Sequence, residues 1–307
     1  MRGRDVRGGR IAGRLALLAA GLLLLTGLGW APAPFSVIDH LRVPFTAGAL
    51  LLLLLSALLR SWPGVLLASL AAAINLAVVA PHLSLGGPAP AAADIRLVHS
   101  NIWNRNADPA RIATMLQQEQ PDVAVLLEVN DPGRDAWLKP LETLFPFRAT
   151  CGDAGCGVLI LSRWPLERLE TGGSVAGHLG YVAARIDRPA GAFTLAGVHL
   201  PQPFRAESQA EAARWVAARL QALPGPVVLT GDFNAAPWSG LMADFAAASG
   251  LHRLAPTQTT WPVWLGPFGI PIDHVFGSTG VSAEARALGN VGSDHRPVAA
   301  SIRLPDP

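Results

Sequence analysis

Cysteine is scarce in this sequence, which has only Cys151 and Cys156 among its 307 residues. Both lie in the Gly-rich segment CGDAGC, between two strand-like runs. A metal site at this pair would need further thiol or imidazole ligands nearby, and the segment supplies none. Paired with each other, the two cysteines would close a tight loop, as expected in an oxidising compartment. Free thiols are the remaining alternative.

Charged side chains are also scarce near the N-terminus, where the first 93 residues carry only nine. Three stretches of 24, 17 and 33 residues (15–38, 43–59 and 61–93) have no charge at all. Each is close to the roughly 20 residues that a helix needs to cross a bilayer. We therefore expect three transmembrane helices within residues 15–85. A cleaved signal peptide would explain only the first stretch, and a water-soluble bundle would carry charges on its exposed faces.

The distribution of arginine predicts how these helices are oriented. Five of the seven arginines before residue 94 fall in residues 1–14, which we expect to be cytoplasmic, and Arg60 marks a second cytoplasmic turn. Only Arg42 falls in the opposite loop. Three spans then place residues 94–307 outside the cytoplasm, in a multi-pass protein of the cell (inner) membrane. Residues 86–93, GGPAPAAA, are expected to form a short linker.

Residues 94–307 lack a basic excess, since 17 Lys and Arg stand against 20 Asp and Glu. Proteins that grip long nucleic acids usually show such an excess. This balance argues against a nuclease, although a local basic patch is compatible with it. Internal repeats and heptad arrays are absent as well.

Short apolar runs alternate with helical patterns through residues 94–307. Strands are expected at 96–103, 122–129, 157–162, 227–233, in a hairpin over 181–200, and in the segments IDHVFG and PVAASIRL. Helices are expected at 108–120, 133–145, 206–223 and 241–249. Mixed strands and helices with hairpins predict a layered α/β sandwich rather than a simple parallel winding.

Polar side chains gather where these strands begin or end: Asn101, Glu128, His199, Asp232 with Asn234, Asp273, and Asp294 with His295. Any one of them alone is more often a turn former or a structural histidine. Together they bring carboxylate, carboxamide and imidazole groups from six strands to one rim, a set that turns do not require. We therefore expect an active site at this rim.

The motifs around these residues resemble the endonuclease/exonuclease/phosphatase superfamily, which includes pancreatic-type deoxyribonucleases, abasic-site endonucleases, sphingomyelinases and inositol-polyphosphate 5-phosphatases. The matching segments are SNIW, LLEVN, GVHLP, GDFN, PIDHVF and SDHRPV. The resemblance implies a four-layer α/β sandwich and a hydrolase of phosphoester or phosphoanhydride bonds. In this chain the sandwich would be preceded by the three transmembrane helices expected above. Some nuclease members place a tyrosine beside the phosphate. Tyr181 is the only tyrosine here, so the phosphate contacts are expected to differ.

A hard cation suits this set of carboxylates and amides, because it prefers oxygen ligands to thiols. We expect Mg²⁺, with Mn²⁺ as the alternative. Glu128 is the expected direct ligand, and Asn101 and Asp294 complete that side directly or through water. Whether the site holds one ion or two stays open at this point.

The remaining polar residues are expected to act on the water and the phosphate. Asp232 and Asn234 lie two apart at one strand end, where they would orient the attacking water and hold a phosphoryl oxygen. Asp273 with His295 forms a carboxylate–imidazole pair that fixes the tautomer and raises basicity. His199 would donate to the phosphate. Either the His295–Asp273 pair or Asp232 would take the proton from water.

The membrane helices and the short linker would keep this site near lipid, so a lipid-linked phosphate or pyrophosphate is the expected substrate. The arrangement also resembles membrane-anchored bacterial members linked to undecaprenyl-pyrophosphate dephosphorylation and glycopeptide resistance. The apolar loop TWPVWLGPFGIP precedes Asp273 and would either pack normally or meet acyl or isoprenoid chains. The alternatives are an anchored nuclease acting on extracellular DNA and a non-catalytic binding module.

Overall fold

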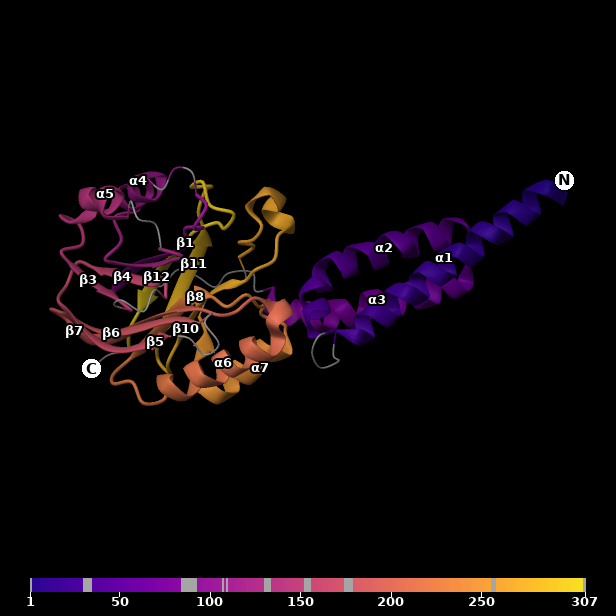
Figure 1. Ribbon diagram of the computed structural model, residues 1–307. Helices are drawn as coiled ribbons and strands as arrows, with labels where there is room; N and C mark the ends of the chain where they lie inside the picture. Colours follow the sequence, from indigo (N-terminus) through magenta and orange to yellow (C-terminus); the bar gives the residue numbers. More distant parts are fainter. Residues whose placement is uncertain are drawn as a thin grey trace. The chain divides into compact units, whose positions relative to one another are not determined.

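The computed structural model describes residues 2–29, 35–83, 93–106, 108, 110–129, 134–151, 156–173, 179–254 and 258–305. The chain divides into two compact units, Met1–Ser84 with Trp238–Gly240, and Leu85–Pro237 with Leu241–Pro307. Figure 1 shows the ribbon of both units. The expected linker, residues 86–93, lies outside the described residues except for Ala93.

The first unit is built from three long helices, which are α1 (Arg2–Leu28), α2 (Arg42–Leu58) and α3 (Trp62–Val79). Two 3-10 helices, η1 (Phe35–Leu41) and η2 (Ala80–His82), flank them. Three segments are long and apolar enough to cross a membrane, namely Gly9–Leu28, Val37–Leu58 and Trp62–His82. Leucine side chains on all three helices are exposed, as expected for surfaces that face hydrocarbon.

Arg42 differs from its expected place in a loop, because it is the first residue of α2 and is fully buried. Its Nε atom contacts the carboxylate of Asp39 at 2.5 Å, and its Nη1 atom donates to the Thr26 carbonyl at 3.0 Å. The Asn75 amide donates to the Thr26 hydroxyl at 2.8 Å. A buried charge is stable only when paired and hydrogen-bonded, so this polar cluster ties α1, α2 and α3 together.

The second unit contains two six-stranded mixed sheets. The first sheet has the strand order β11 (Ser282–Ala287), β12 (Val298–Arg303), β1 (Ile95–Asn101), β2 (Val123–Leu127), β4 (Leu159–Ser162) and β3 (Phe147–Thr150). The second has the order β5 (Leu166–Gly173), β6 (Gly180–Arg188), β7 (Gly191–His199), β8 (Val227–Asp232), β10 (Asp273–Gly277) and β9 (His252–Arg253).

Helices cover the outer face of each sheet, as Figure 1 shows. Helix α4 (Ala110–Glu119) and helix α5 (Arg134–Leu138), which continues into η3 (Lys139–Leu141), lie on the first sheet. Helix α6 (Ala206–Leu220) and helix α7 (Gly240–Ser249) lie on the second. An apolar core fills the space between the two sheets. The order helix, sheet, sheet, helix confirms the expected four-layer sandwich.

Alternating side-chain directions explain how the strands fill these layers. In β1, Ile95 and Leu97 point into the core between the sheets, and Val98 points toward α4. Because both faces are covered, β2 reads as five buried apolar residues in a row.

Gly231 in β8 permits close contact with β7. A Cβ atom at this position would lie 1.9 Å from the Val198 carbonyl oxygen. The parallel pairing of β7 with β8 places His199 opposite Asp232. The glycine of the GDFN motif is therefore required for packing just before the site begins.

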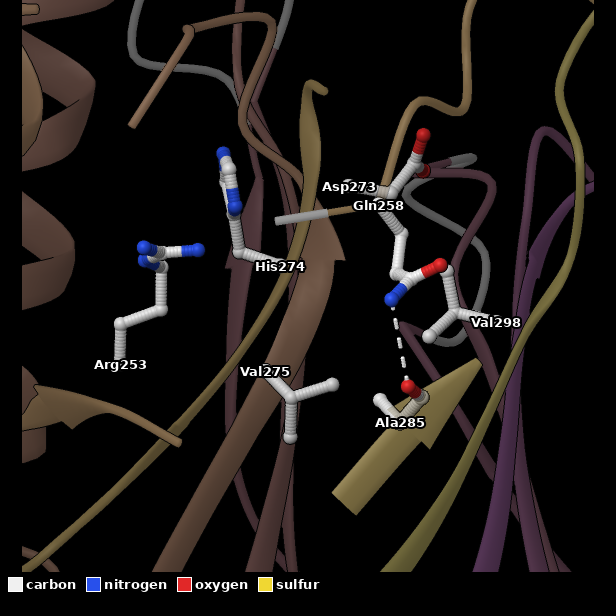
Figure 2. Close-up of a pocket in the computed structure, with 7 residues that line it drawn as sticks. All are labelled: Arg253, Gln258, Asp273, His274, Val275, Ala285 and Val298. Carbon is white, nitrogen blue, oxygen red and sulfur yellow. Dashed lines mark hydrogen bonds between the residues drawn. The ribbon is translucent and has the colours of Figure 1, made fainter. Parts of the chain in front are cut away.

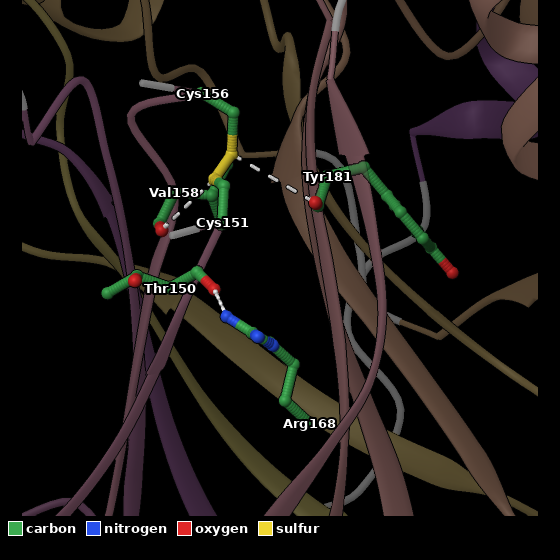
Figure 3. Close-up of a disulfide and its surroundings, with 6 residues drawn as sticks. All are labelled: Thr150, Cys151, Cys156, Val158, Arg168 and Tyr181. Carbon is green, nitrogen blue, oxygen red and sulfur yellow. Dashed lines mark hydrogen bonds between the residues drawn. A yellow bond between two sulfur atoms is a disulfide. The ribbon is translucent and has the colours of Figure 1, made fainter. Parts of the chain in front are cut away.

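The disulfide between Cys151 and Cys156 is formed, as expected from the isolated cysteine pair. Figure 3 shows the bond with Val158 and Tyr181 beside it. The Cys151 sulfur lies near the Val158 carbonyl, and the Cys156 sulfur lies near the Tyr181 carbonyl. The bridge therefore lies beside Tyr181 of β6, in the other sheet.

Candidate active site

The strands bring the predicted site residues to one edge of the two-sheet core. Strands β1 and β2 are parallel, so Asn101 at the end of β1 lies opposite Leu127, one residue before Glu128. Strand β10 runs antiparallel to β8, so its first residue, Asp273, pairs with Asp232 at the end of β8.

Asn101 joins two carboxylates of this edge, Glu128 and Asp232. Its Nδ2 atom donates to Glu128 Oε1 at 3.0 Å and to Asp232 Oδ2 at 3.2 Å. Its Oδ1 atom accepts from the Trp103 backbone N–H at 3.0 Å. Glu128 Oε2 accepts from the backbone N–H of Asn104 at 3.0 Å. One amide therefore holds a carboxylate from each sheet in place.

Asp232 lies between two histidines. Its Oδ2 atom is 3.7 Å from His199 Nε2 and 3.6 Å from His295 Nε2. Its Oδ1 atom accepts the Asn234 backbone N–H at 2.8 Å. Burial raises the pKa of the Asp232 carboxyl group, and the charges of His295 and His199 oppose that rise. Asp232 is thus a buried carboxylate with an unusually high affinity for a proton.

Asp273 binds two imidazoles, one on each carboxylate oxygen. His295 Nδ1 lies 2.9 Å from Oδ2, and His99 Nε2 lies 2.8 Å from Oδ1. Burial alone would raise the pKa of Asp273, but the charge of His295 and hydrogen bonds from both histidines lower it. Burial alone would lower the pKa of His295, but the charges of Asp273 and Asp232 raise it to about 10.

Asp294 connects the site to the apolar loop. Its Oδ2 atom accepts from the Trp261 indole Nε1 at 3.1 Å, and its carbonyl accepts from the Val263 backbone N–H at 2.8 Å. Its Oδ1 atom is buried and has no hydrogen-bond partner among the described residues. An unpartnered buried carboxylate oxygen is costly, so this atom is available for a cation or an ordered water.

Asn234 is held by the backbone around it. Its side-chain Nδ2 donates to the Leu200 carbonyl at 2.9 Å, and Gln209 from α6 donates to the Asn234 carbonyl at 2.9 Å. Asn234 and Glu128 also have positive φ angles, 50° and 60°. Such backbone conformations are unfavourable for side-chain-bearing residues and concentrate at functional sites.

The structure brings all eight predicted site residues to this edge, with Asp294 and Asn234 at its periphery. Glu128 and His199 form its open part, with side chains 20% and 23% exposed. Asp232, Asp273 and His295 are buried behind them.

The donor set fits a divalent cation. Asp232, Asp273 and His295 each offer a ligand atom within 4.8 Å of the others. Asp273 and His295 already bind each other, however, and the second oxygen of Asp273 already binds His99. The more open oxygens of Glu128 and the unpartnered oxygen of Asp294 are the better ligands. They are oxygen donors without thiols, which a hard cation prefers.

His99 was missed by the sequence analysis, which assigned it no role. It lies two residues before Asn101 in the same strand, so both point to the same face. This spacing of two residues is the feature of the sequence that could have placed His99 on the same face as Asn101.

A small pocket also lies beside Asp273, lined by residues of β9, β10, β11 and β12 and by Gln258. In Figure 2 Gln258 bonds the Ala285 carbonyl, and His274 points away from Val275. Burial lowers the pKa of His274 to about 4. His274 Nε2 lies 2.8 Å from the Ala235 carbonyl, so its role in this region is structural.

A family model described as "Endonuclease/Exonuclease/phosphatase family" matches residues 98–295. The fold is similar to beta toxin from Staphylococcus aureus with bound magnesium ions, at 18% identity and a TM-score of 0.52, over 68% of this chain and 99% of the toxin. It is also similar to a mannosyl-6-phosphatase from Bacteroides thetaiotaomicron, at 18% identity and a TM-score of 0.55, over 69% of this chain and 100% of the phosphatase.

The fold is similar as well to D. rerio TDP2 complexed with a single-strand DNA product, at 16% identity and a TM-score of 0.57, over 68% of this chain and 99% of that one. No curated protein matches the chain significantly by sequence. At these identities the solved structures establish the fold, and the family match covers every predicted site residue.

Proposed function

This chain belongs to the endonuclease/exonuclease/phosphatase family, and from that membership we propose that it is a membrane-anchored hydrolase of a lipid-linked phosphate or pyrophosphate. Members of the family are hydrolases that act on phosphoester bonds and depend on divalent metals. The single observation that carries the finer proposal is the presence, in one chain, of this site and three helices able to cross a membrane.

Glu128 and Asp294, with Asn101 beside them, would hold the ion, which we propose to be Mg²⁺. The bound ion neutralises charge on the phosphoryl oxygens. The protein's own residues position the water and move its proton. Asp232 is the best base, because burial raises its pKa and its Oδ2 atom lies between two imidazoles.

His295 is better suited to stabilise charge than to take the first proton. Its pKa of about 10 keeps the imidazole protonated at neutral pH in the absence of an ion. Asp273 fixes the ring through Nδ1 and leaves Nε2 directed toward Asp232. His199, which is 23% exposed, would donate to a phosphoryl oxygen. Asn234 would help to hold a phosphoryl oxygen on the same side of the site.

The apolar loop that precedes Asp273 (residues 260–271) supports the proposal of a lipid substrate. No charged residue occurs between Arg253 and Asp273. Trp264 and Phe268, in the 3-10 helix η6 (Val263–Phe268), are 77% and 76% exposed. Exposed aromatic side chains in an uncharged loop suit the boundary between water and lipid. Trp261, at the base of this loop, contacts the site through Asp294.

The decisive experiment compares substrates. Purified full-length protein with Mg²⁺ is given undecaprenyl pyrophosphate in detergent, double-stranded DNA, or single-stranded DNA, with Glu128→Gln as the inactive control. We expect phosphate release from the lipid and little DNA cleavage. Efficient DNA cleavage without phosphate release would overturn the lipid proposal and favour a nuclease acting on extracellular DNA.

The proposed orientation is tested separately. A reporter fused after Leu304 should be active only outside the cytoplasm, because the N-terminal arginine cluster is retained inside. Activity of the fusion only in the cytoplasm would contradict the proposed topology.

A further inference from the structure

We propose that His99 is a positioning residue for the reaction, which holds Asp273 so that Asp273 can hold His295. The proposal deepens the proposed function and rests on phosphoester hydrolysis at this site. His99 itself contacts neither the open part of the site nor Asp232 in the described structure. It acts through Asp273 alone.

The geometry gives each oxygen of Asp273 one imidazole. His99 Nε2 is 2.8 Å from Oδ1, and His295 Nδ1 is 2.9 Å from Oδ2. The side chains of His99 and Asp273 are each 1% exposed. Turning the plane of the carboxylate about its Cβ–Cγ bond would weaken both contacts, so the bond from His99 fixes the plane in which Asp273 receives His295.

The position of His99 in a central strand holds its backbone in place. Strand β1 is hydrogen-bonded on both sides, to β2 and to β12, and His99 pairs with Val298 in that register. The face of β1 that is turned toward the second sheet carries Ile95, Leu97, His99 and Asn101. His99 therefore stands between the apolar core and the site, where it links the first sheet to Asp273 in the second.

A role in packing alone does not explain why a histidine occupies position 99. Its Nδ1 atom is buried without a hydrogen-bond partner among the described residues, which carries a desolvation cost. Leucine or valine would fill a core position without that cost. The hydrogen bond to Asp273 is the feature of His99 that an apolar residue could not supply.

The test replaces His99 with two side chains of similar length. His99→Gln keeps an N–H donor that can reach Asp273, whereas His99→Met fills the space without donating. Full-length protein in detergent is assayed with Mg²⁺ on bis(p-nitrophenyl) phosphate, a soluble phosphodiester. His252→Ala, at an exposed histidine in β9, is the control.

We expect His99→Met to lower kcat about 10- to 100-fold, as for other residues that orient a catalytic group, with KM changed by no more than about twofold. His99→Gln should recover most of the lost rate. Adding His99→Met to Asp273→Asn should cost little more, because the two residues act as one unit. Equal kcat values for the Gln and Met variants, or losses that multiply with Asp273→Asn, would overturn the proposal.

A second measurement does not depend on turnover. The proton shared by His295 and Asp273 should give a downfield ¹H NMR signal that is present in wild type, retained in His99→Gln and lost or shifted in His99→Met. An unchanged signal in both variants would contradict the positioning role. If wild type hydrolysed no phosphoester at all, the proposed function would fail while this signal would still decide the role of His99.

Discussion

Glu128 is the residue on which a bound cation should depend most. Its side chain is 20% exposed, against 2% for that of Asp232. The Asn101 amide and the Asn104 backbone N–H hold its two oxygens. Glu128→Gln removes the negative charge but keeps the shape. We expect at least a 100-fold loss of metal-dependent activity, of the order seen when one charge-stabilising group is removed. The fold should be retained in EDTA with a loss of stability of about 1–3 kcal/mol, because the amide can accept only one of the two hydrogen bonds that the carboxylate accepts.

The matched control is Glu211→Gln, on the exposed face of α6. It should leave activity unchanged. Calorimetric titration of Mg²⁺ into the Glu128→Gln protein should show weaker binding than titration into wild type. Full activity of the wild-type protein in EDTA would contradict the metal dependence of the site.

Asp273 and His295 should behave as one unit. Their bond of 2.9 Å lies in a buried environment, where removal of either partner leaves the other without its counter-charge. We expect Asp273→Asn, His295→Ala and the double variant to lose similar factors in kcat. If the two single losses multiplied in the double variant, the pair would not be acting together.

The pKa of His295 predicts how stability depends on pH. In the folded protein it is raised from 6.5 to about 10, so the pair contributes its full stabilisation below pH 6.5. That contribution is lost as pH rises toward about 10. In EDTA, the difference in thermal midpoint between wild type and His295→Gln should therefore shrink from pH 6.5 to pH 10. A constant or growing difference would contradict the raised pKa.

That the proposed site residues lie close together could be predicted, because each one is found next to the beginning or the end of an apolar strand. The sequence does not show how those ends meet, and that is why the links between them were missed. The contact of Trp261 with Asp294 joins residues 33 positions apart, and the contact of His99 with Asp273 joins residues 174 apart. Only the pairing of the two sheets in space reveals either contact.

At the scale of secondary structure, the central strands were predicted and the edge strands were not. The strands β3, β5, β9 and β11 stand at the four edges of the two sheets and were not assigned. Edge strands are partly solvated, so their sequences lack a continuous apolar run. β11, for example, has no fully buried residue. Helix positions were predicted more closely, with α6 ending three residues before the expected position.

Strand β8 gives the prediction at this scale. In Gly231→Ala, the new Cβ atom would lie 1.9 Å from the Val198 carbonyl oxygen, so β7 and β8 would have to separate. We expect a destabilisation of about 3 kcal/mol or more, at the upper end of overpacking effects, with loss of activity because His199 and Asp232 are paired across these strands.

Gly289→Ala is the control for this change, since a Cβ atom there meets nothing within 4 Å. Its denaturation midpoint should match that of wild type. A Gly231→Ala protein as stable as the control would show that β7 and β8 can adjust without cost.

At the scale of the whole molecule, the proposed role of the three helices is to supply substrate. Removing residues 1–93 should lower the rate on a lipid pyrophosphate in vesicles much more than the rate on bis(p-nitrophenyl) phosphate, because the anchor raises the local concentration of the lipid. Both rates are measured per folded molecule. Equal losses on the two substrates would mean that the helices support folding instead of access to lipid.

The position of the last strand determines when the enzyme is complete. Strand β12 does not lie at an edge but between β11 and β1, and its pairing joins Ile95 to Ile302. A chain emerging from the ribosome cannot close this sheet until β12 has been synthesised. Contacts so distant in sequence form slowly. Strands β1 and β12 are therefore expected to pair late in folding. Chains that lack β12 are expected to have no hydrolase activity.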